Sequence, residues 1–216
     1  MCGQLDQLAR GATAAGTYET IRALPGAAQS GDARSDAALM AQVAQGDRRA
    51  IRVLFERYQL VVYRFVLRLT GNSASAEDIV SEVFLELWRH AASFEGRSRL
   101  STWILAIARN KTVSARRGRG EGPLDDAVAQ AVPDEAATAE QTLDAARRGA
   151  ILRQCLARLS APHREIIDLV YYHEKSVEEV AAIVGAGTAT VKTRMFYARR
   201  RLAEHLKAAG VEAVDC

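Results

Sequence analysis

The chain has 216 residues, of which 49% are hydrophobic and 25% are charged, and its formal net charge is +3. These fractions are typical of a soluble globular protein of one domain or two small ones. No run of about eighteen apolar residues occurs, and the N-terminus lacks the basic and apolar segments of a signal peptide. We therefore expect a cytoplasmic protein without a membrane span.

The first 35 residues are rich in glycine, alanine and serine and have no sustained hydrophobic period. Such a composition supplies little to a core. We interpret residues 1–35 as a flexible leader.

The cysteines and histidines have no spacing that suggests a metal site or a catalytic nucleophile. The three cysteines, Cys2, Cys155 and Cys216, are odd in number and far apart. They are either incidental thiols of a reducing compartment or, for the two terminal ones, a redox-sensing pair. We expect no metal, no cofactor and no enzymatic activity.

Apolar residues at helical spacing predict four helices over residues 36–117. The first is short and ends at Gly46, and the second is long, amphipathic and ends near Thr70. Ser75 is a suitable N-cap for the third helix, because acidic residues follow it in the first turn. The fourth begins near Ser101 and carries arginines on its outer face. Together these helices predict one compact domain.

An acidic segment follows this domain. Seven acidic residues and no lysine or arginine occur between Glu121 and Asp144, and large apolar residues are few. We interpret residues 118–142 as a linker. Residues 143–209 then predict a second helical domain, and residues 210–216 a tail. No strand pattern occurs in either domain, so the predicted class is all-α with two small helical domains.

The second domain ends in a predicted helix-turn-helix. Ser176 and Glu179 have the spacing of a capping box, which predicts a helix from about Val177. Gly185 and Gly187 allow a sharp turn, and Thr188 is a good N-cap for a further helix.

The further helix has two distinct faces. Its inward face holds Val191, Met195, Ala198, Leu202 and Leu206. Its outward face holds Thr193, Phe196, Tyr197 and Arg200, beside Lys192. Cationic side chains bind phosphates or guanine edges and an aromatic ring can contact a thymine methyl, so this face suits the DNA major groove. The alternatives are a solvated charge run or a helix lying on a membrane.

Three stretches resemble the sigma-70 family of bacterial transcription initiation factors, specifically its extracytoplasmic-function (ECF) group. They are residues 76–84, residues 94–110 with the arginines that follow, and residues 159–166 leading into Val191-Lys-Thr-Arg. The resemblance implies a non-catalytic subunit that binds core RNA polymerase, opens the −10 promoter element with the first domain and contacts the −35 element with the second. It also implies a cognate anti-sigma factor as a partner.

The resemblance assigns residues to each role. Polymerase contacts are expected at Glu77, Asp78, Ser81 and Glu82, and contacts to the melted −10 strand at Arg97, Arg99, Ser101, Arg109 and Asn110. Contacts to −35 DNA are expected at Thr188, Thr190, Lys192, Thr193, Phe196, Tyr197 and Arg200. Ser81 and Tyr197 depart from the family pattern, which often has glutamine and a basic residue there. Trp103 is expected in the core.

Two questions stay open. The acidic linker is either a plain tether or a segment that enters the polymerase cleft and partly imitates RNA. The chain itself could instead be a stand-alone helix-turn-helix regulator, for which two-fold symmetric operators and a protein dimer would be expected.

Overall fold

The computed structural model describes residues 35–118 and 143–210, with side chains in the second range described from residue 149. Every regular element in these ranges is a helix, so the predicted all-α class is confirmed. The predicted leader, acidic linker and tail lie outside the described residues, apart from Ser35, Gly118 and Gly210.

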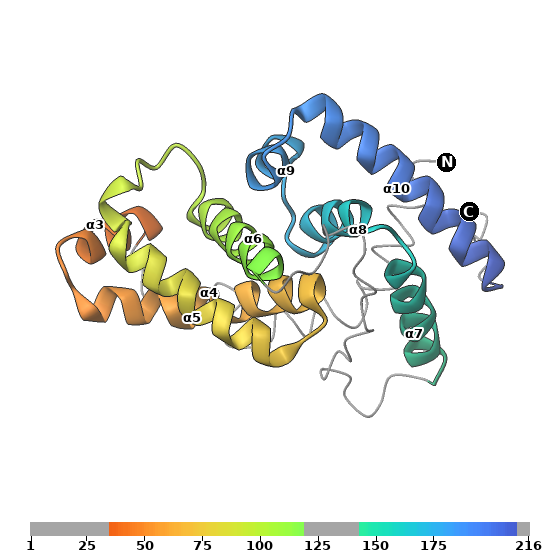
Figure 1. Ribbon diagram of the computed structural model, residues 1–216, viewed down its shortest axis with the longest axis horizontal. Coiled ribbons are helices and arrows are strands. Elements are labelled where there is room, and N and C mark those ends of the chain that lie inside the picture. The colour runs from red at the N-terminus through yellow and green to blue at the C-terminus, as the bar shows by residue number, and fades with distance from the viewer. Residues whose placement is uncertain (1–34, 119–142, 211–216) are drawn as a thin grey trace.

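The first domain contains four α-helices and one short 3₁₀ helix (Figure 1, orange to green). They are α3 (Asp36–Ala44), α4 (Arg48–Thr70), α5 (Ser73–Arg89), η1 (Ala91–Ser93) and α6 (Leu100–Gly118). The second domain contains α7 (Leu143–Ala157), α8 (Ala161–Ile167), the π-helical turn η3 (Asp168–Tyr172), α9 (Val177–Val184) and α10 (Thr188–Ala208).

The core of the first domain is formed by the apolar stripe of each helix. Fully buried side chains include Leu39, Leu54, Phe65, Val83, Leu87 and Ile104. Burying a side chain of this size contributes roughly 1.5–3 kcal/mol relative to leaving it in water. Trp103 is only partly buried and packs against Phe94, with ring centroids 5.4 Å apart, so it belongs to the margin of the core.

Polar contacts fix the start of α3 on α4. The Tyr58 hydroxyl donates a 2.5 Å hydrogen bond to Asp36, which also pairs with Arg57. Burial raises the pKa of Tyr58, and the neighbouring Asp36 carboxylate raises it further. The phenol therefore remains a donor at neutral pH, and Asp36 joins the first turn of α3 to the long helix.

The N-cap of α5 differs from the prediction. Asn72 is the N-cap, and its side-chain oxygen accepts from the backbone amide of Ser75 at 2.9 Å. The predicted cap, Ser75, lies inside the first turn. Asparagine is at least as good a cap as serine, and Asn72 directly follows Gly71, which ends α4 in the left-handed conformation with φ 67°.

The predicted helix-turn-helix is confirmed, with one correction. The capping box of Ser176 and Glu179 is present, and Gly185 ends α9 with φ 65°. Thr188, however, is the first residue of α10, and Gly187 is its N-cap without a side-chain bond. The turn is thus one residue shorter than the sequence suggested.

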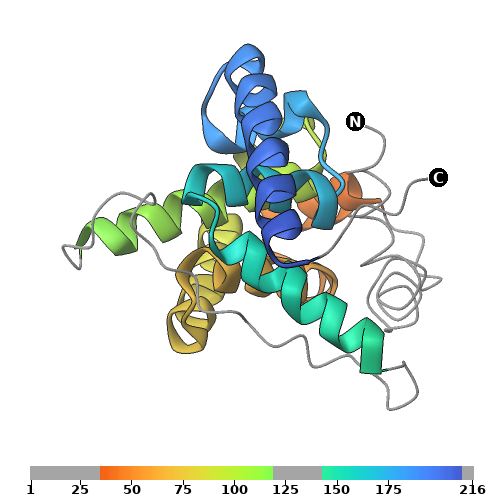
Figure 2. The ribbon, with the colours of Figure 1, turned by 90° about the vertical axis from the view of Figure 1, so that its right-hand side faces the viewer.

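Helix α6 lies between α5 and the second domain (Figure 1). It packs against α5 on one side and against α9 on the other. Helix α10 lies on the side of the second domain away from the first, and Figure 2 shows it in front. The two domains therefore meet at α6 and at the C-terminal part of α4, and the outer face of α10 stays clear of that contact.

Candidate nucleic-acid interface

Helix α10 separates apolar from polar side chains as predicted. Val191, Met195, Ala198, Leu202 and Leu206 are all buried. The residues predicted to contact −35 DNA are all exposed: Thr188, Thr190, Lys192, Thr193, Phe196, Tyr197 and Arg200. The helix is held by one face and presents the other to solvent.

Two aromatic rings stand out on the exposed face of α10. Phe196 is 58% exposed and Tyr197 is 50% exposed, and their centroids lie 5.4 Å apart. Large apolar side chains left in solvent on one patch are typical of a contact surface. Among them, Phe196 has no polar group that water could satisfy, which suits contact with a thymine methyl.

The cations of α10 are weakly held. Arg200 Nε and Arg201 Nη1 lie 3.2 Å and 3.1 Å from the carboxylate oxygens of Glu204. Because all three side chains are largely exposed, such pairs contribute about 0–1 kcal/mol and exchange easily for a phosphate. Lys192 is exposed about two turns closer to the start of the helix.

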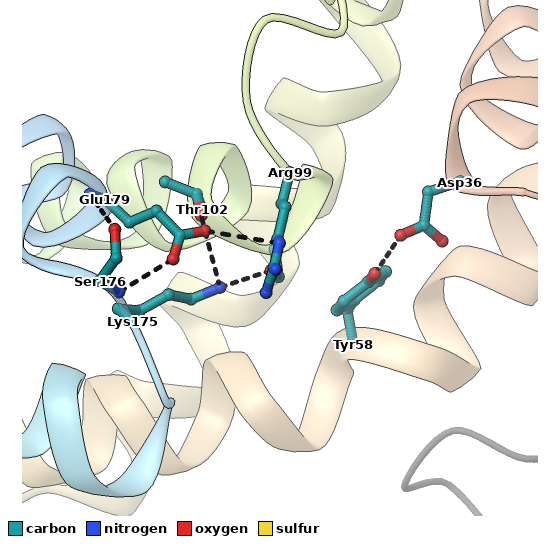
Figure 3. A network of polar contacts seen from close by, with 8 residues as sticks. Asp36, Tyr58, Arg99, Thr102, Lys175, Ser176 and Glu179 are labelled. Atoms are coloured by element: carbon teal, nitrogen blue, oxygen red, sulfur yellow. Dashed lines mark hydrogen bonds and ion pairs between the residues drawn. The ribbon is translucent and has the colours of Figure 1, made fainter.

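The predicted strand contacts near α6 fall into two groups. Arg97, Arg99 and Asn110 are exposed, and Arg97 pairs with its neighbour Glu95. Arg99 also lies 4.0 Å from Glu179 of the second domain (Figure 3), and Ser101 and Arg109 contact that domain more closely, with the Arg109 side chain 20% exposed. The structure thus brings only part of the predicted set to the surface.

The predicted polymerase contacts form one exposed face of α5. Glu77, Asp78, Ser81 and Glu82 are all exposed, and the Ser81 hydroxyl donates to the Glu77 carbonyl at 3.2 Å. Lys111 of α6 lies 3.9 Å from Glu82. This face therefore presents exposed carboxylates that suit a basic partner.

Lys111 interacts more closely with Glu86, at 3.2 Å. A hydrogen bond from Lys111 is the main cause that lowers the pKa of Glu86. This pair joins α5 to α6 at the edge of the acidic face.

Sequence analysis missed Leu85. It is 48% exposed and lies three and four residues after Glu82 and Ser81, on the same side of α5. The signal was available, because Leu85 falls off the apolar stripe that contains Phe84 and Leu87. Phe55 of α4 is also 37% exposed and touches Phe84, with centroids 4.8 Å apart.

No group of three metal-ligating side chains occurs within residues 35–118 and 143–210. Among the helices described, none is both long and apolar enough to cross a bilayer. Cys155 is buried, and burial raises the pKa of its thiol, so it is a poor nucleophile. Cys2 and Cys216 lie outside the described residues.

Family comparison matches both domains. The chain matches the model of sigma-70 region 2 at residues 54–121 and that of sigma-70 region 4 at residues 149–202. It is 33% identical to the ECF RNA polymerase sigma factor SigL of Mycobacterium tuberculosis, over 84% of this chain and 97% of that protein. It is 30% identical to the ECF RNA polymerase sigma factor SigW of Bacillus subtilis, over 77% and 94% respectively.

Two solved structures share the fold. One is the sigma factor RpoE of Bartonella quintana in complex with the anti-sigma factor NepR, with a TM-score of 0.56 and 29% identity, covering 72% of this chain and 96% of that one. The other is CnrH in complex with the cytosolic domain of CnrY, with a TM-score of 0.59 and 24% identity, covering 81% and 99%. The latter similarity supports the fold alone.

Proposed function

Because this chain belongs to the ECF group of the sigma-70 family and is an RNA polymerase sigma factor of that group, we propose that three of its surfaces divide the work of promoter recognition. The observation that carries the proposal is the exposure of every predicted −35 contact on α10 while the opposite face of the helix is buried. The relatives match both domains, which does not favour a stand-alone regulator.

The exposed face of α10 contacts the −35 element in the major groove. Lys192 and Arg200 supply cations for phosphates or guanine edges, and Phe196 supplies an apolar contact. Gly185 and the capping box of α9 support this role, because they hold α10 at a fixed angle to the rest of the helix-turn-helix.

The exposed face of α5 contacts core RNA polymerase. Asp78, Glu82 and Leu85 follow one another on the same side of the helix, with Leu85 as an exposed apolar side chain at the end of the acidic row. An apolar anchor surrounded by charges is the usual anatomy of a specific protein interface. A basic helical surface on the polymerase is the partner that this face fits.

The loop before α6 and the outer face of α6 hold the displaced −10 strand. Arg97 and Arg99 are exposed in the loop, and Asn110 is exposed on the helix. Binding of a single strand requires cations along its backbone and a pocket for an unstacked base. Ser101 and Arg109, which contact the second domain in this structure, are not part of this exposed set.

We also propose an anti-sigma factor as partner, because the solved sigma factor RpoE described above was determined in complex with an anti-sigma factor. The protein acts without catalysis of its own and works in the cytoplasm, where RNA polymerase transcribes.

The test is co-purification of the full chain with core RNA polymerase, followed by run-off transcription on genomic fragments with and without the chain. We expect stable association and promoter-specific transcripts that depend on the chain. Asp78→Ala and Glu82→Ala should weaken association, and Phe196→Ala and Arg200→Ala should weaken promoter choice alone. DNA recognition by the isolated chain, with no affinity for polymerase, would contradict the proposal.

A further inference from the structure

The outward side of α10 is mainly apolar over its first turns. Side chains at helical spacing share this side of the helix. They are Ala189, Thr193, Phe196, Tyr197 and Arg200, and all are exposed. Only Arg200, the last of them, carries a charge. The four that precede it form what we call the apolar strip.

The hydroxyl group of Thr193 is turned toward the backbone. It donates to the carbonyl oxygen of Ala189 at 3.0 Å, one turn earlier in the helix. Threonines inside helices often make this bond. Because the hydroxyl proton is used within the helix, Thr193 offers a base chiefly its methyl group, and Ala189 has only a methyl group to offer.

The cations of this segment lie around the apolar strip rather than within it. Residues 189–197 include no asparagine or glutamine, and their one arginine, Arg194, is half-buried. Arg199 is also half-buried, and its guanidinium lies over the Tyr171 ring, 5.7 Å from the centroid. Lys192 stands about 100° around the helix from Thr193. The middle of the outward side therefore lacks the donors that usually recognise guanine or adenine.

Phe196 and Tyr197 hold each other in place. Their rings meet edge to face, with an interplanar angle of 76° and centroids 5.4 Å apart. Aromatic pairs favour this geometry, which stabilises them beyond the effect of buried area. The separation of the centroids, 5.4 Å, exceeds the rise of one base pair, about 3.4 Å, and is smaller than the rise of two. The rings are thus set at a spacing that suits neighbouring base pairs.

We propose that the apolar strip recognises thymine methyl groups, and that Phe196 and Tyr197 contact the methyls of two neighbouring A·T pairs. This inference rests on the function proposed above for α10 and specifies which bases that surface selects. Among the four bases only thymine carries a methyl group in the major groove, and alanine, threonine and phenylalanine side chains make apolar contact with it. Tyr197 is a specificity-determining residue, because a basic side chain in its place would select guanine.

The experiment uses holoenzyme assembled from the full chain and core RNA polymerase. Duplex fragments with a randomised −35 segment are selected by binding to the holoenzyme and are then sequenced. We expect two neighbouring thymines on one strand of the selected element. If the holoenzyme selects no sequence in this segment, the function proposed for α10 fails, and the inference fails with it.

The methyl groups are then tested one at a time in the selected duplex by fluorescence anisotropy. Uracil in place of thymine removes only the methyl group, so holoenzyme affinity should fall about fourfold per methyl, the effect of burying one such group. Cytosine in place of thymine should also weaken binding, and 5-methylcytosine should recover about fourfold. This recovery separates contact with the methyl from recognition of the shape of A·T-rich DNA, which 5-methylcytosine does not restore.

Variants of the two rings should change the response to the methyl group. In Phe196→Ala and in Tyr197→Ala, thymine and uracil should bind equally at one position each, whereas Tyr197→Phe should keep the wild-type ratio. Arg200→Ala is the matched control on the same side of α10, because it should lower affinity for both duplexes and keep their ratio. Both rings are at least half exposed, so these changes spare the core, and circular dichroism verifies folding.

Three results would overturn the inference and leave the −35 contact by α10 standing. The selected element could contain no neighbouring thymines, or uracil could replace both thymines without loss of affinity. The loss caused by uracil could also persist in Phe196→Ala and Tyr197→Ala, which would assign the methyl contact to another part of the holoenzyme.

Discussion

The Thr102 hydroxyl donates to Oε1 of Glu179, and the other carboxylate oxygen of Glu179, Oε2, accepts from the backbone amide of Ser176 at 3.0 Å. One side chain thus caps α9 and also joins that helix to α6. The start of the helix-turn-helix and the contact between the domains share a carboxylate, so a change to Glu179 affects both.

Glu165 and Glu179, the two glutamates that contact the first domain, should have pKa values shifted in opposite directions. Burial tends to raise the pKa of Glu179, but hydrogen bonds from Ser176 and Thr102 and the charges of Lys175 and Arg99 hold it below its ordinary value. Burial raises the pKa of Glu165 above its ordinary value. Carbon-detected NMR titration of the carboxyl groups should place them on opposite sides of about 4.3. Thr102→Val should raise the pKa of Glu179.

These shifts have opposite consequences for stability. The folded-state pKa of Glu179 is lowered, so its contribution is present above the unfolded pKa and is lost as pH falls through the folded value. The folded-state pKa of Glu165 is raised, so its contribution is present below the unfolded pKa and is lost as pH rises through the folded value. Finding both pKa values on one side of the ordinary value would contradict the buried arrangement.

Replacement of Gly185, in the turn between α9 and α10, should lower the stability of the protein. A Cβ there would meet nothing within 4 Å, but φ is +65°, which L-residues rarely adopt. Gly185→Ala should therefore destabilise the protein by about 1–2 kcal/mol. Gly185→Asn is the control, because asparagine tolerates this conformation and should lose less. Urea unfolding followed by circular dichroism measures both, and equal losses would show that φ is not the cause.

Leu85 and Leu87 offer a matched pair on α5. Leu85 is 48% exposed and Leu87 is fully buried. Leu85→Ala should leave stability within about 0.5 kcal/mol and weaken polymerase binding about tenfold, as expected of an interface anchor. Leu87→Ala should cost about 2–5 kcal/mol of stability. Thermal melts and surface plasmon resonance with core polymerase separate the effects, and unaltered binding by Leu85→Ala would exclude it from the interface.

Phe196 and Arg200 should affect DNA binding in different ways. Arg200→Ala should reduce the slope of log affinity against log salt by about 1, if the guanidinium binds a phosphate. Phe196→Ala should leave that slope unchanged and relax preference for one base, at a cost of about 1–3 kcal/mol for the preferred site. Anisotropy titrations of the holoenzyme with −35 duplexes at several salt concentrations measure both. Identical behaviour of the two variants would refute separate roles.

The two faces of α10 could be predicted from the sequence, because helical periodicity alone determines which side chains share a side. The five residues expected inward are the five that are buried. N-caps were less predictable. Asn72 and Ser75 are both suitable residues three positions apart, and only the backbone conformation decides between them.

The contact between the domains could not be predicted. Glu165 and Asp168 stand on either side of Ile166 and Ile167, and nothing in the local sequence indicates which cations neutralise them, but both are buried. Their partners, Arg109 and Arg68, are 56 and 100 residues away in the numbering, and no periodic pattern links such distant positions. Arg109 lies on an arginine-rich helix, and this pattern predicts that it binds a DNA phosphate. In the structure the carboxylate of Glu165 pairs with the same guanidinium.

Because Asp168–Tyr172 forms a π-helical turn, the number of residues in this segment matters as much as their identity. A π turn contains an extra residue relative to an α-helical one. Loss of one residue there would restore the α-helical repeat and rotate Tyr172 and His173 by about 100° relative to α8. The Tyr172 ring, 4.6 Å from the Arg68 guanidinium, and the His173 ring, 5.6 Å from the Phe65 ring, would then both lose these contacts. Variants of this chain should therefore tolerate substitutions within the π-helical turn more readily than insertions or deletions there.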